Sequence, residues 1–242
     1  MRTIRLYCPE LNSDLDEFTL PSAIHRHAVQ VLRLKKGNRV QLFDGKGLEY
    51  NAEFIEVGKR ESRVELKEKL QINVESPLDV TLLQGISRGE RMDYALQKAV
   101  ELGVNRIIPV ETERCNVQLS SGRADKRLAH WQGVIVSACE QSGRSVLPSL
   151  TTIMSLEQAL KASDASCRLI LDPEATSGFT TIEKHDSIAL LIGPEGGLSE
   201  QEINNAEQAE FQPVRFGPRI LRTETATAAA LAVIQTLWGD LG

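Results

Sequence analysis

The 242-residue sequence has few cysteines, few aromatic residues and no long apolar run. Its four cysteines, Cys8, Cys115, Cys139 and Cys167, form no C-x-x-C pair, which argues against a zinc site or a disulfide framework. No run of about 18 apolar residues occurs, so we expect no membrane span. Residues 1–5 also lack the apolar core of a signal peptide. We therefore expect a cytoplasmic protein with reduced thiols and no metal site.

Two common phosphate-binding motifs are also absent. The sequence contains neither G-x-G-x-x-G nor G-x-x-x-x-G-K-[ST], which argues against a dinucleotide fingerprint and a P-loop. The formal net charge of −5 argues against indiscriminate binding to nucleic acid, which depends on neutralising phosphates. Residues 1–72 nevertheless carry thirteen Lys and Arg against eleven Asp and Glu, whereas the remaining residues carry fifteen against twenty-two. If RNA is bound, we expect the N-terminal segment to provide a local basic face.

The pattern of apolar residues changes near residues 73–77 and predicts two domains. Residues 1–72 contain short stretches that alternate apolar and polar residues between glycine-containing turns, which is typical of a small β-barrel. One helix, capped by Ser22, should turn four apolar residues inward: Ile24, Ala28, Val31 and Leu32. Residues 73–242 alternate apolar strands with helices, which predicts a parallel sheet covered on both faces.

A glycine-rich loop in the second domain offers the first candidate site. It runs Gly193-Pro194-Glu195-Gly196-Gly197 and follows a continuous apolar strand at residues 188–192. Ser199 and Glu202 then form a capping box, which starts a helix. The loop thus lies between the carboxyl end of a strand and the amino end of a helix, where open α/β sheets bind ligands.

A second loop, residues 217–225, has the same position between a short strand and an Ala-rich helix. It contains Arg219 and Arg222 just before the helix N-terminus, where the macrodipole disfavours cations. We therefore expect an anion, a carboxylate or a phosphate, to bind between these two arginines.

Residues 193–197 followed by Leu221-Arg222-Thr223-Glu224-Thr225-Ala226 resemble the paired signatures of a known family. This is the RsmE family of ribosomal small-subunit (16S) RNA methyltransferases, which belong to the SPOUT superfamily and methylate N3 of a uridine. Further matches extend the resemblance over the whole chain: Arg2, Arg5, Tyr7 and residues 27–37, 85–91, 99–103, 112–115 and 139–144.

The resemblance implies an α/β fold with two domains. Residues 1–72 would form a PUA-like RNA-binding β-barrel domain, and residues 73–242 a trefoil-knotted SPOUT methyltransferase domain. Periodicity predicts the parallel sheet but not the knot, because true knots are very rare. The resemblance also implies S-adenosylmethionine as cofactor, a homodimer, and small-subunit ribosomal RNA, in the assembled subunit, as substrate.

We expect the cofactor in a cleft formed by three strand-end loops, where backbone groups can satisfy the adenine edge. The predicted cofactor-binding residues are Leu171, Asp172, Pro173, Ile192, Gly193, Pro194, Gly196, Gly197, Leu198, Ile220, Leu221, Thr223 and Thr225. The predicted RNA-binding residues are Arg2, Arg5, Arg33, Lys35, Lys36, Arg88, Arg91, Arg114 and Arg144. For each single arginine, an ordinary surface ion pair is the alternative.

Transfer to uridine N3 requires loss of the N3 proton, so a base or an anion-stabilising donor is needed. Glu195 is the predicted base, and Arg222 is predicted to stabilise the developing uridine anion. Glu224 is the other candidate carboxylate, and either glutamate could instead only accept hydrogen bonds at a helix N-terminus.

Two functions of other classes stay open. The chain could be an RNA-binding protein without activity, or an unrelated α/β enzyme that binds a nucleoside phosphate on the glycine loop. The intact glycines and the Arg222-Thr223-Glu224 sequence favour the methyltransferase.

Overall fold

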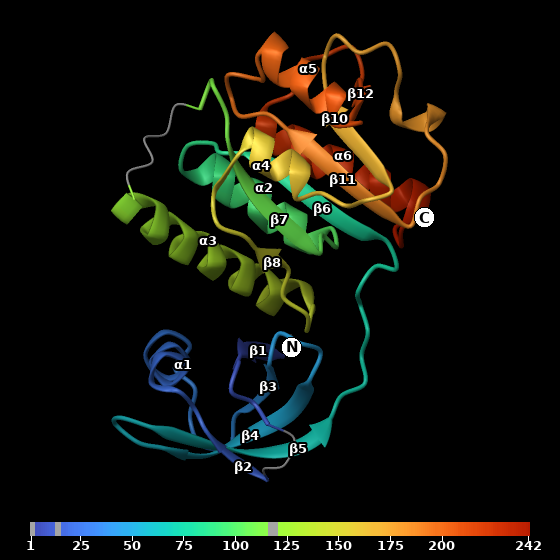
Figure 1. Cartoon of the computed structure of the whole chain (residues 1–242). Helices are drawn as coiled ribbons and strands as arrows, with labels where there is room; N and C mark the ends of the chain where they lie inside the picture. Colours follow the sequence, from blue (N-terminus) through green and yellow to red (C-terminus); the bar gives the residue numbers. More distant parts are fainter. Residues whose placement is uncertain (1–2, 13–15, 116–120) are drawn as a thin grey trace. The chain divides into compact units, whose positions relative to one another are not determined.

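The computed structural model describes residues 3–12, 16–115 and 121–242, which form two compact units (Figure 1). Unit 1 comprises Met1–Glu75 with Cys139–Leu147, and unit 2 comprises Ser76–Ala138 with Pro148–Gly242. A segment from the middle of the chain therefore packs with the N-terminal residues. The domain boundary between residues 72 and 73 stays a prediction.

Unit 1 contains a five-stranded sheet in the order β1-β3-β4-β5-β2. Its strands are β1 (Ile4–Tyr7), β2 (Glu17–Thr19), β3 (Arg39–Phe43), β4 (Glu49–Val57) and β5 (Ser62–Lys69). The first two in spatial order are parallel and the other pairs are antiparallel. Alternate residues such as Ala52 and Phe54 are buried, as the period of two predicts. The predicted β-domain is therefore present.

The helical segment of unit 1 differs from its prediction. Helix α1 (Ser22–Arg26) has Pro21 as its N-cap residue and no side-chain cap, so the predicted Ser22 cap is wrong. It continues as a π-helix, η1 (His27–Val31). Because π-helical hydrogen bonds span five residues instead of four, the helical period shifts. Val31, predicted to point inward, is consequently 65% exposed.

Unit 2 contains a seven-stranded sheet in the order β12-β10-β11-β6-β7-β8, with β9 also pairing with β7. The strands are β6 (Asp79–Gly85), β7 (Arg106–Glu111), β8 (Ser149–Leu150), β9 (Met154–Ser155), β10 (Cys167–Leu171), β11 (Ser187–Ile192) and β12 (Gln212–Val214). Every pair is parallel. This confirms the predicted parallel sheet.

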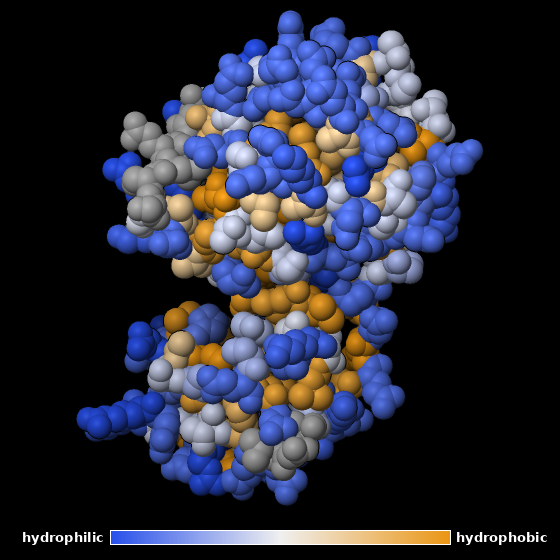
Figure 2. Space-filling model, in the orientation of Figure 1, coloured by the Kyte–Doolittle hydropathy of each residue, from blue (hydrophilic) through white to orange (hydrophobic). Residues whose placement is uncertain are grey.

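Helices cover this sheet. They are α2 (Glu90–Glu101), α3 (Ser121–Ser142), α4 (Leu156–Lys161), the 3₁₀-helix η2 (Phe179–Thr181), α5 (Glu200–Gln208) and α6 (Thr223–Trp238). Residues of α4 and α5 pack against the sheet face that carries Ala189 and Leu191, and α2 packs against α6. No helix of the described ranges is long and apolar enough to cross a membrane. On the face drawn in Figure 2, hydrophilic residues cover most of the surface of each unit.

The parallel arrangement places the carboxyl ends of β10, β11 and β12 at one edge of the sheet. The glycine-rich loop leaves β11 there and leads into α5, whose capping box has both predicted hydrogen bonds. The second predicted loop follows β12 and leads into α6. The structure therefore brings both candidate loops to one edge. The trefoil knot stays a prediction.

Candidate functional site

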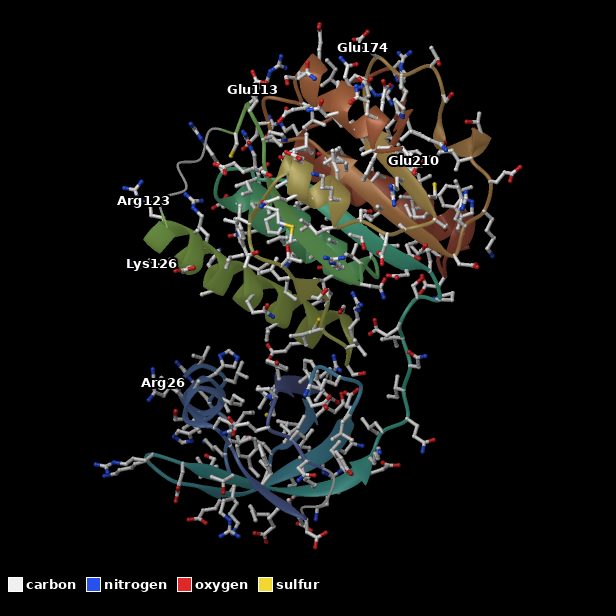
Figure 3. The ribbon with its side chains drawn as sticks, in the orientation of Figure 1. Arg26, Glu113, Arg123, Lys126, Glu174 and Glu210 are labelled. Carbon is white, nitrogen blue, oxygen red and sulfur yellow. The ribbon has the colours of Figure 1, made fainter. Side chains whose placement is uncertain are left out.

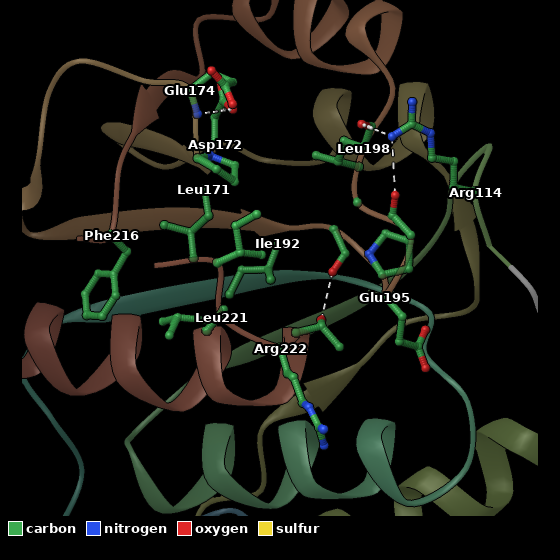
Figure 4. Close-up of a pocket in the computed structure, with 18 of the residues that line it drawn as sticks. Arg114, Leu171, Asp172, Glu174, Ile192, Glu195, Leu198, Phe216, Leu221 and Arg222 are labelled. Carbon is green, nitrogen blue, oxygen red and sulfur yellow. Dashed lines mark hydrogen bonds between the residues drawn. The ribbon is translucent and has the colours of Figure 1, made fainter. Parts of the chain in front are cut away.

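A cavity of about 720 Å³ lies at this edge of unit 2 (Figure 4). Its volume is within the range of small-molecule sites. Twelve of the thirteen predicted cofactor-binding residues line it, and Thr225 does not. The larger apolar side chains of its wall are Leu171, Ile192, Leu198, Ile203, Val214, Phe216, Ile220 and Leu221.

Buried hydrogen bonds connect the glycine-rich loop to the start of α6. The Thr223 hydroxyl donates to the carbonyl of Gly193 (2.8 Å) and accepts from Nε2 of Gln84 (3.1 Å). Gln84 is fully buried near the end of β6 and accepts from the Thr227 hydroxyl (2.7 Å). The sequence predicts Thr223 as a cofactor contact, whereas its hydroxyl is engaged inside the protein. Sequence reasoning missed Gln84 and Thr227, because no local pattern joins residues more than 130 positions apart.

The glycine-rich loop also lies unusually close to its neighbours. A Cβ added at Gly85 would lie 2.5 Å from the nitrogen of Pro194, so only glycine lets β6 end this near the loop. A Cβ added at Gly196 would lie 2.9 Å from the Cβ of Arg114. These approaches fix the loop against the ends of β6 and β7.

Arg114 follows β7 and binds the backbone of this loop. Its Nη1 donates to the carbonyls of Gly196 (3.3 Å) and Leu198 (3.2 Å). Arg114, predicted as an RNA contact, therefore first holds two carbonyls beside the cavity. Its side chain is exposed, and RNA contact stays a prediction.

The Glu195 carboxylate is held on the other side of the loop. Its Oε1 accepts from the backbone N–H of Arg88 (2.9 Å) and from Nη1 of Arg91 (3.2 Å). Burial raises the pKa of the Glu195 carboxyl, but the hydrogen bonds from Arg88, its own N–H and Arg91 outweigh burial and hold the pKa below its usual range. A lowered pKa makes the carboxylate a weaker base, which counts against Glu195 as the proton acceptor.

Arg222 and Glu224 present different charged groups to the same cavity. Arg222 is the exposed N-cap residue of α6, and its side chain makes no hydrogen bond or ion pair with any described residue. In Figure 4 the side chains of Arg222 and Glu195 both extend away from the apolar wall. One carboxylate oxygen of Glu224, Oε2, is buried with no hydrogen-bond partner among the described residues. The cavity thus combines an apolar wall with a charged border.

Comparisons with known proteins agree with this geometry. A family model described as "RNA methyltransferase domain" matches residues 74–235, and one described as "RNA methyltransferase PUA domain" matches residues 21–67. A "Ribosomal RNA small subunit methyltransferase E" from Buchnera aphidicola subsp. Schizaphis graminum is 35% identical over 225 residues, 92% of each chain. The chain belongs to the RsmE family of RNA methyltransferases.

Two solved structures are similar to this RsmE-family chain over their whole length. A ribosomal RNA small subunit methyltransferase E from Neisseria gonorrhoeae, bound to S-adenosyl methionine, is 43% identical, with a TM-score of 0.93 and complete coverage of both chains. A Legionella pneumophila protein in complex with the bound cofactor SAM is 38% identical, with a TM-score of 0.96 and complete coverage of both chains. The predicted family and the predicted fold class, a PUA-like domain followed by a SPOUT-type methyltransferase domain, are therefore confirmed.

The predicted RNA contacts of this RsmE-family chain have different surroundings. Arg33, Lys35 and Lys36 are exposed in unit 1, just before β3, and Arg88 and Arg91 are exposed in unit 2. These five stay predictions. Another predicted contact, Arg2, lies outside the described residues.

Two predicted RNA contacts, Arg5 and Arg144, have buried side chains that form ion pairs. The Arg5 side chain is 8% exposed, pairs with Glu49 at 3.0 Å and lies 4.5 Å from the ring centre of Phe43. Arg144 is 3% exposed and pairs with Glu75 at 2.5 Å. Both guanidinium groups are therefore engaged inside unit 1, which counts against RNA contact, and RNA contact by these two residues stays a prediction. Their partners lie 44 and 69 residues away in sequence, so no local pattern could indicate them.

Proposed function

We propose that the chain is an S-adenosylmethionine-dependent enzyme that methylates N3 of a specific uridine in small-subunit (16S) ribosomal RNA. The observation that carries the proposal is the convergence of both signature loops on one cavity of cofactor size. Membership of the RsmE family supports it, as does the S-adenosyl methionine in the Neisseria relative.

The residues of the cavity fit an adenosine-containing cofactor. The apolar side chains of the wall can enclose a purine ring, and backbone groups of the glycine-rich loop can satisfy its polar edge. The bonds from Thr223 and Arg114 to the loop keep these backbone groups in place before the cofactor binds. When bound, S-adenosylmethionine supplies a methyl group on a positively charged sulfur. The protein contributes chiefly by positioning the uridine for in-line transfer.

The charged border of the cavity suits the methyl acceptor. Arg222 has a guanidinium with no partner among the described residues, so it can stabilise the negative charge that develops on the uracil ring. Two carboxylates are candidates for accepting the N3 proton. Glu195 is the base that the sequence predicts, and its lowered pKa favours a positioning role instead. Glu224 is the alternative, because its Oε2 has no partner in the described part of the chain.

We also propose that the chain acts in the cytoplasm, because its substrate would be ribosomal. From the RsmE resemblance we further propose that it forms a homodimer and that it methylates the assembled small subunit. Sedimentation of the purified chain tests the homodimer. Parallel assays with free small-subunit RNA and with assembled subunits identify the preferred substrate.

Cofactor binding and product identity test the proposed function together. At about a hundredfold excess over its dissociation constant, S-adenosylmethionine should stabilise the fold by roughly 2.7 kcal/mol, and ATP and NAD should not. Digested small-subunit RNA should contain uridine methylated at N3. RNA binding without cofactor binding would support an RNA-binding protein without activity, and binding of ATP alone would support a nucleoside phosphate enzyme.

A further inference from the structure

Unit 2 has another depression, of about 300 Å³, between the start of α2 and the N-terminal half of α3. Its lining residues are Ser87, Gly89, Asp93, Arg123, Lys126, Arg127, His130 and Trp131. We call it the basic groove, because half of these side chains are basic and all of the basic ones come from α3. Methyl transfer as proposed above does not use them.

The basic side chains share one face of α3. Arg123, Lys126, Arg127 and His130 stand at positions i, i+3, i+4 and i+7, which are neighbours on a helix surface. Figure 3 shows Arg123 and Lys126 projecting from the first turns of the helix. Like charges at these spacings repel each other, and no Asp or Glu stands three or four positions from any of them. An anion bound across this face would relieve the repulsion.

The groove has little negative charge of its own. Asp93 is the one acidic residue among its described lining, and both of its carboxylate oxygens lie 2.9 Å from Nε2 of His130. Apart from Asp93, which pairs with His130, the lining contributes no acidic side chain to balance Arg123, Lys126 and Arg127. Trp131 is 3% exposed, so its ring forms part of the wall and offers no surface for a stacked base. Basic side chains with little acidic charge and no exposed aromatic ring suit phosphate groups rather than bases.

The groove is continuous with the methyltransferase cavity along the chain. Gly89 lines the groove, and Arg91, two residues later, lines the cavity. Their Cα atoms are at most about 8 Å apart, since consecutive Cα atoms are separated by about 3.8 Å. The N–H of Arg88, the residue before Gly89, donates to the cavity residue Glu195. An RNA strand that leaves the cavity over residues 88–91 would therefore reach the groove.

We propose that the basic groove binds backbone phosphates of the RNA strand beside the target uridine. This rests on the proposed function, because the groove is assigned to the same substrate. Phosphate contacts by Lys and Arg position a nucleic acid but do not read its bases. The groove therefore contributes affinity and register, while the cavity selects the base.

A charge-neutralising pair tests the groove against a matched surface pair. The groove variant is Arg123→Gln/Lys126→Gln, and the control is Lys161→Gln/Lys184→Gln, which also removes two exposed charges from unit 2. The probe is a small-subunit ribosomal RNA fragment, and affinity is measured at equilibrium over a range of salt concentrations. We expect the groove variant to bind about tenfold more weakly and to lose about 1.4 from the slope of log affinity against log salt. Its melting temperature and S-adenosylmethionine affinity should match those of the wild type.

Wild-type RNA affinity and salt slope in the groove variant would overturn this proposal, even if the enzyme methylates uridine. An equal loss in the control variant would also overturn it, because overall charge would then explain the effect. RNA binding is measured without turnover. A chain that binds RNA through the groove but binds no S-adenosylmethionine would therefore refute the proposed function and keep the groove.

Discussion

At the scale of single residues, the site combines a cation without a partner and a carboxylate with several. Arg222 stands at the start of α6, where the helix macrodipole disfavours a positive charge, and no described residue compensates it. Glu195 instead receives hydrogen bonds from the N–H of Arg88 and from Arg91. The first arrangement suits a residue kept for a ligand, and the second suits a residue that holds the loop.

Arg222→Ala should reduce methyl transfer far more than it reduces stability. Losing a hydrogen bond to a charged group costs about 1.5–3 kcal/mol, which corresponds to a rate loss of about ten- to a hundredfold if the bond forms in the transition state. Arg222→Lys should recover little, because a point charge does not replace the guanidinium fork. Single-turnover methylation and thermal melting of each variant are the measurements. Near-normal turnover in Arg222→Ala, or a fall in melting temperature that explains the whole loss, would make Arg222 a structural residue.

Glu195 should make the free energy of unfolding decrease at acid pH. Its pKa in the folded chain lies below the unfolded value of about 4.3, so its interactions stabilise the fold above that pH and are lost as the pH falls through the folded pKa. When the pH falls from about 5 to about 3, the free energy of unfolding should therefore decrease less in Glu195→Gln than in the wild type. Urea unfolding of both proteins at the two pH values measures the difference. Equal losses would show that Arg91 and the N–H of Arg88 do not stabilise the carboxylate.

At the scale of elements, a buried polar network joins β6, the glycine-rich loop and α6. Gln84 accepts from Thr227 and donates to Thr223, which donates to the carbonyl of Gly193. The side chains of Gln84, Thr223 and Thr227 are buried, so loss of one of these partners leaves a buried polar atom unsatisfied. The network thus connects the stability of unit 2 to the position of the loop.

Thr227→Val should lower the free energy of unfolding by about 1–3 kcal/mol, because the Gln84 carbonyl oxygen loses its donor while the side-chain volume is kept. The affinity for S-adenosylmethionine should fall as well, since the network reaches the glycine-rich loop. Thr236→Val is the matched control: this exposed hydroxyl of the same helix donates to the carbonyl of Ala232, and its loss should change stability by less than about 0.5 kcal/mol. Equal effects of the two substitutions would contradict the role of the network.

The sequence predicts those elements whose signals are local. The capping box at Ser199 needs only four residues, and it is present with its two hydrogen bonds. The run Ser187–Ile192 forms the predicted buried strand β11. Because parallel strands end at one edge, the sequence also predicts that both signature loops meet there.

Local sequence patterns do not predict long-range contacts or a change in helical period. Arg5 is buried by Glu49 and Phe43, and nothing near it in the sequence shows this. Val31 points outward because a π-helix, which the apolar spacing does not indicate, shifts the period. The basic residues of α3 stand at helical spacing in the sequence, but no local pattern indicates that the start of α2 lies beside them and completes the groove.

At the scale of the whole molecule, the two compact units divide the chain unevenly. Cys139–Leu147 belongs to unit 1, and Arg144 within it forms an ion pair with Glu75. Tyr7 donates its backbone N–H to Glu140 at 3.1 Å, and burial is the main cause of the raised pKa of the Glu140 carboxyl. A fragment that starts at Ser76 would therefore contain this segment without its partners.

The pair of Arg144 and Glu75 should stabilise unit 1 specifically. Their side chains are 4% and 17% exposed, and removing one partner of a buried pair leaves an uncompensated charge, which costs about 3–5 kcal/mol. Glu75→Leu should therefore increase hydrogen exchange of the amides of β4 and β5, while S-adenosylmethionine affinity, a property of unit 2, stays unchanged. Glu53→Leu is the control, because its pair with Arg39 is 34% and 86% exposed and should contribute less than about 1 kcal/mol. The prediction fails if Glu75→Leu increases exchange no more than Glu53→Leu does, or if it weakens cofactor binding as much as it weakens unit 1. Either result would mean that the ion pair does not hold Cys139–Leu147 in unit 1.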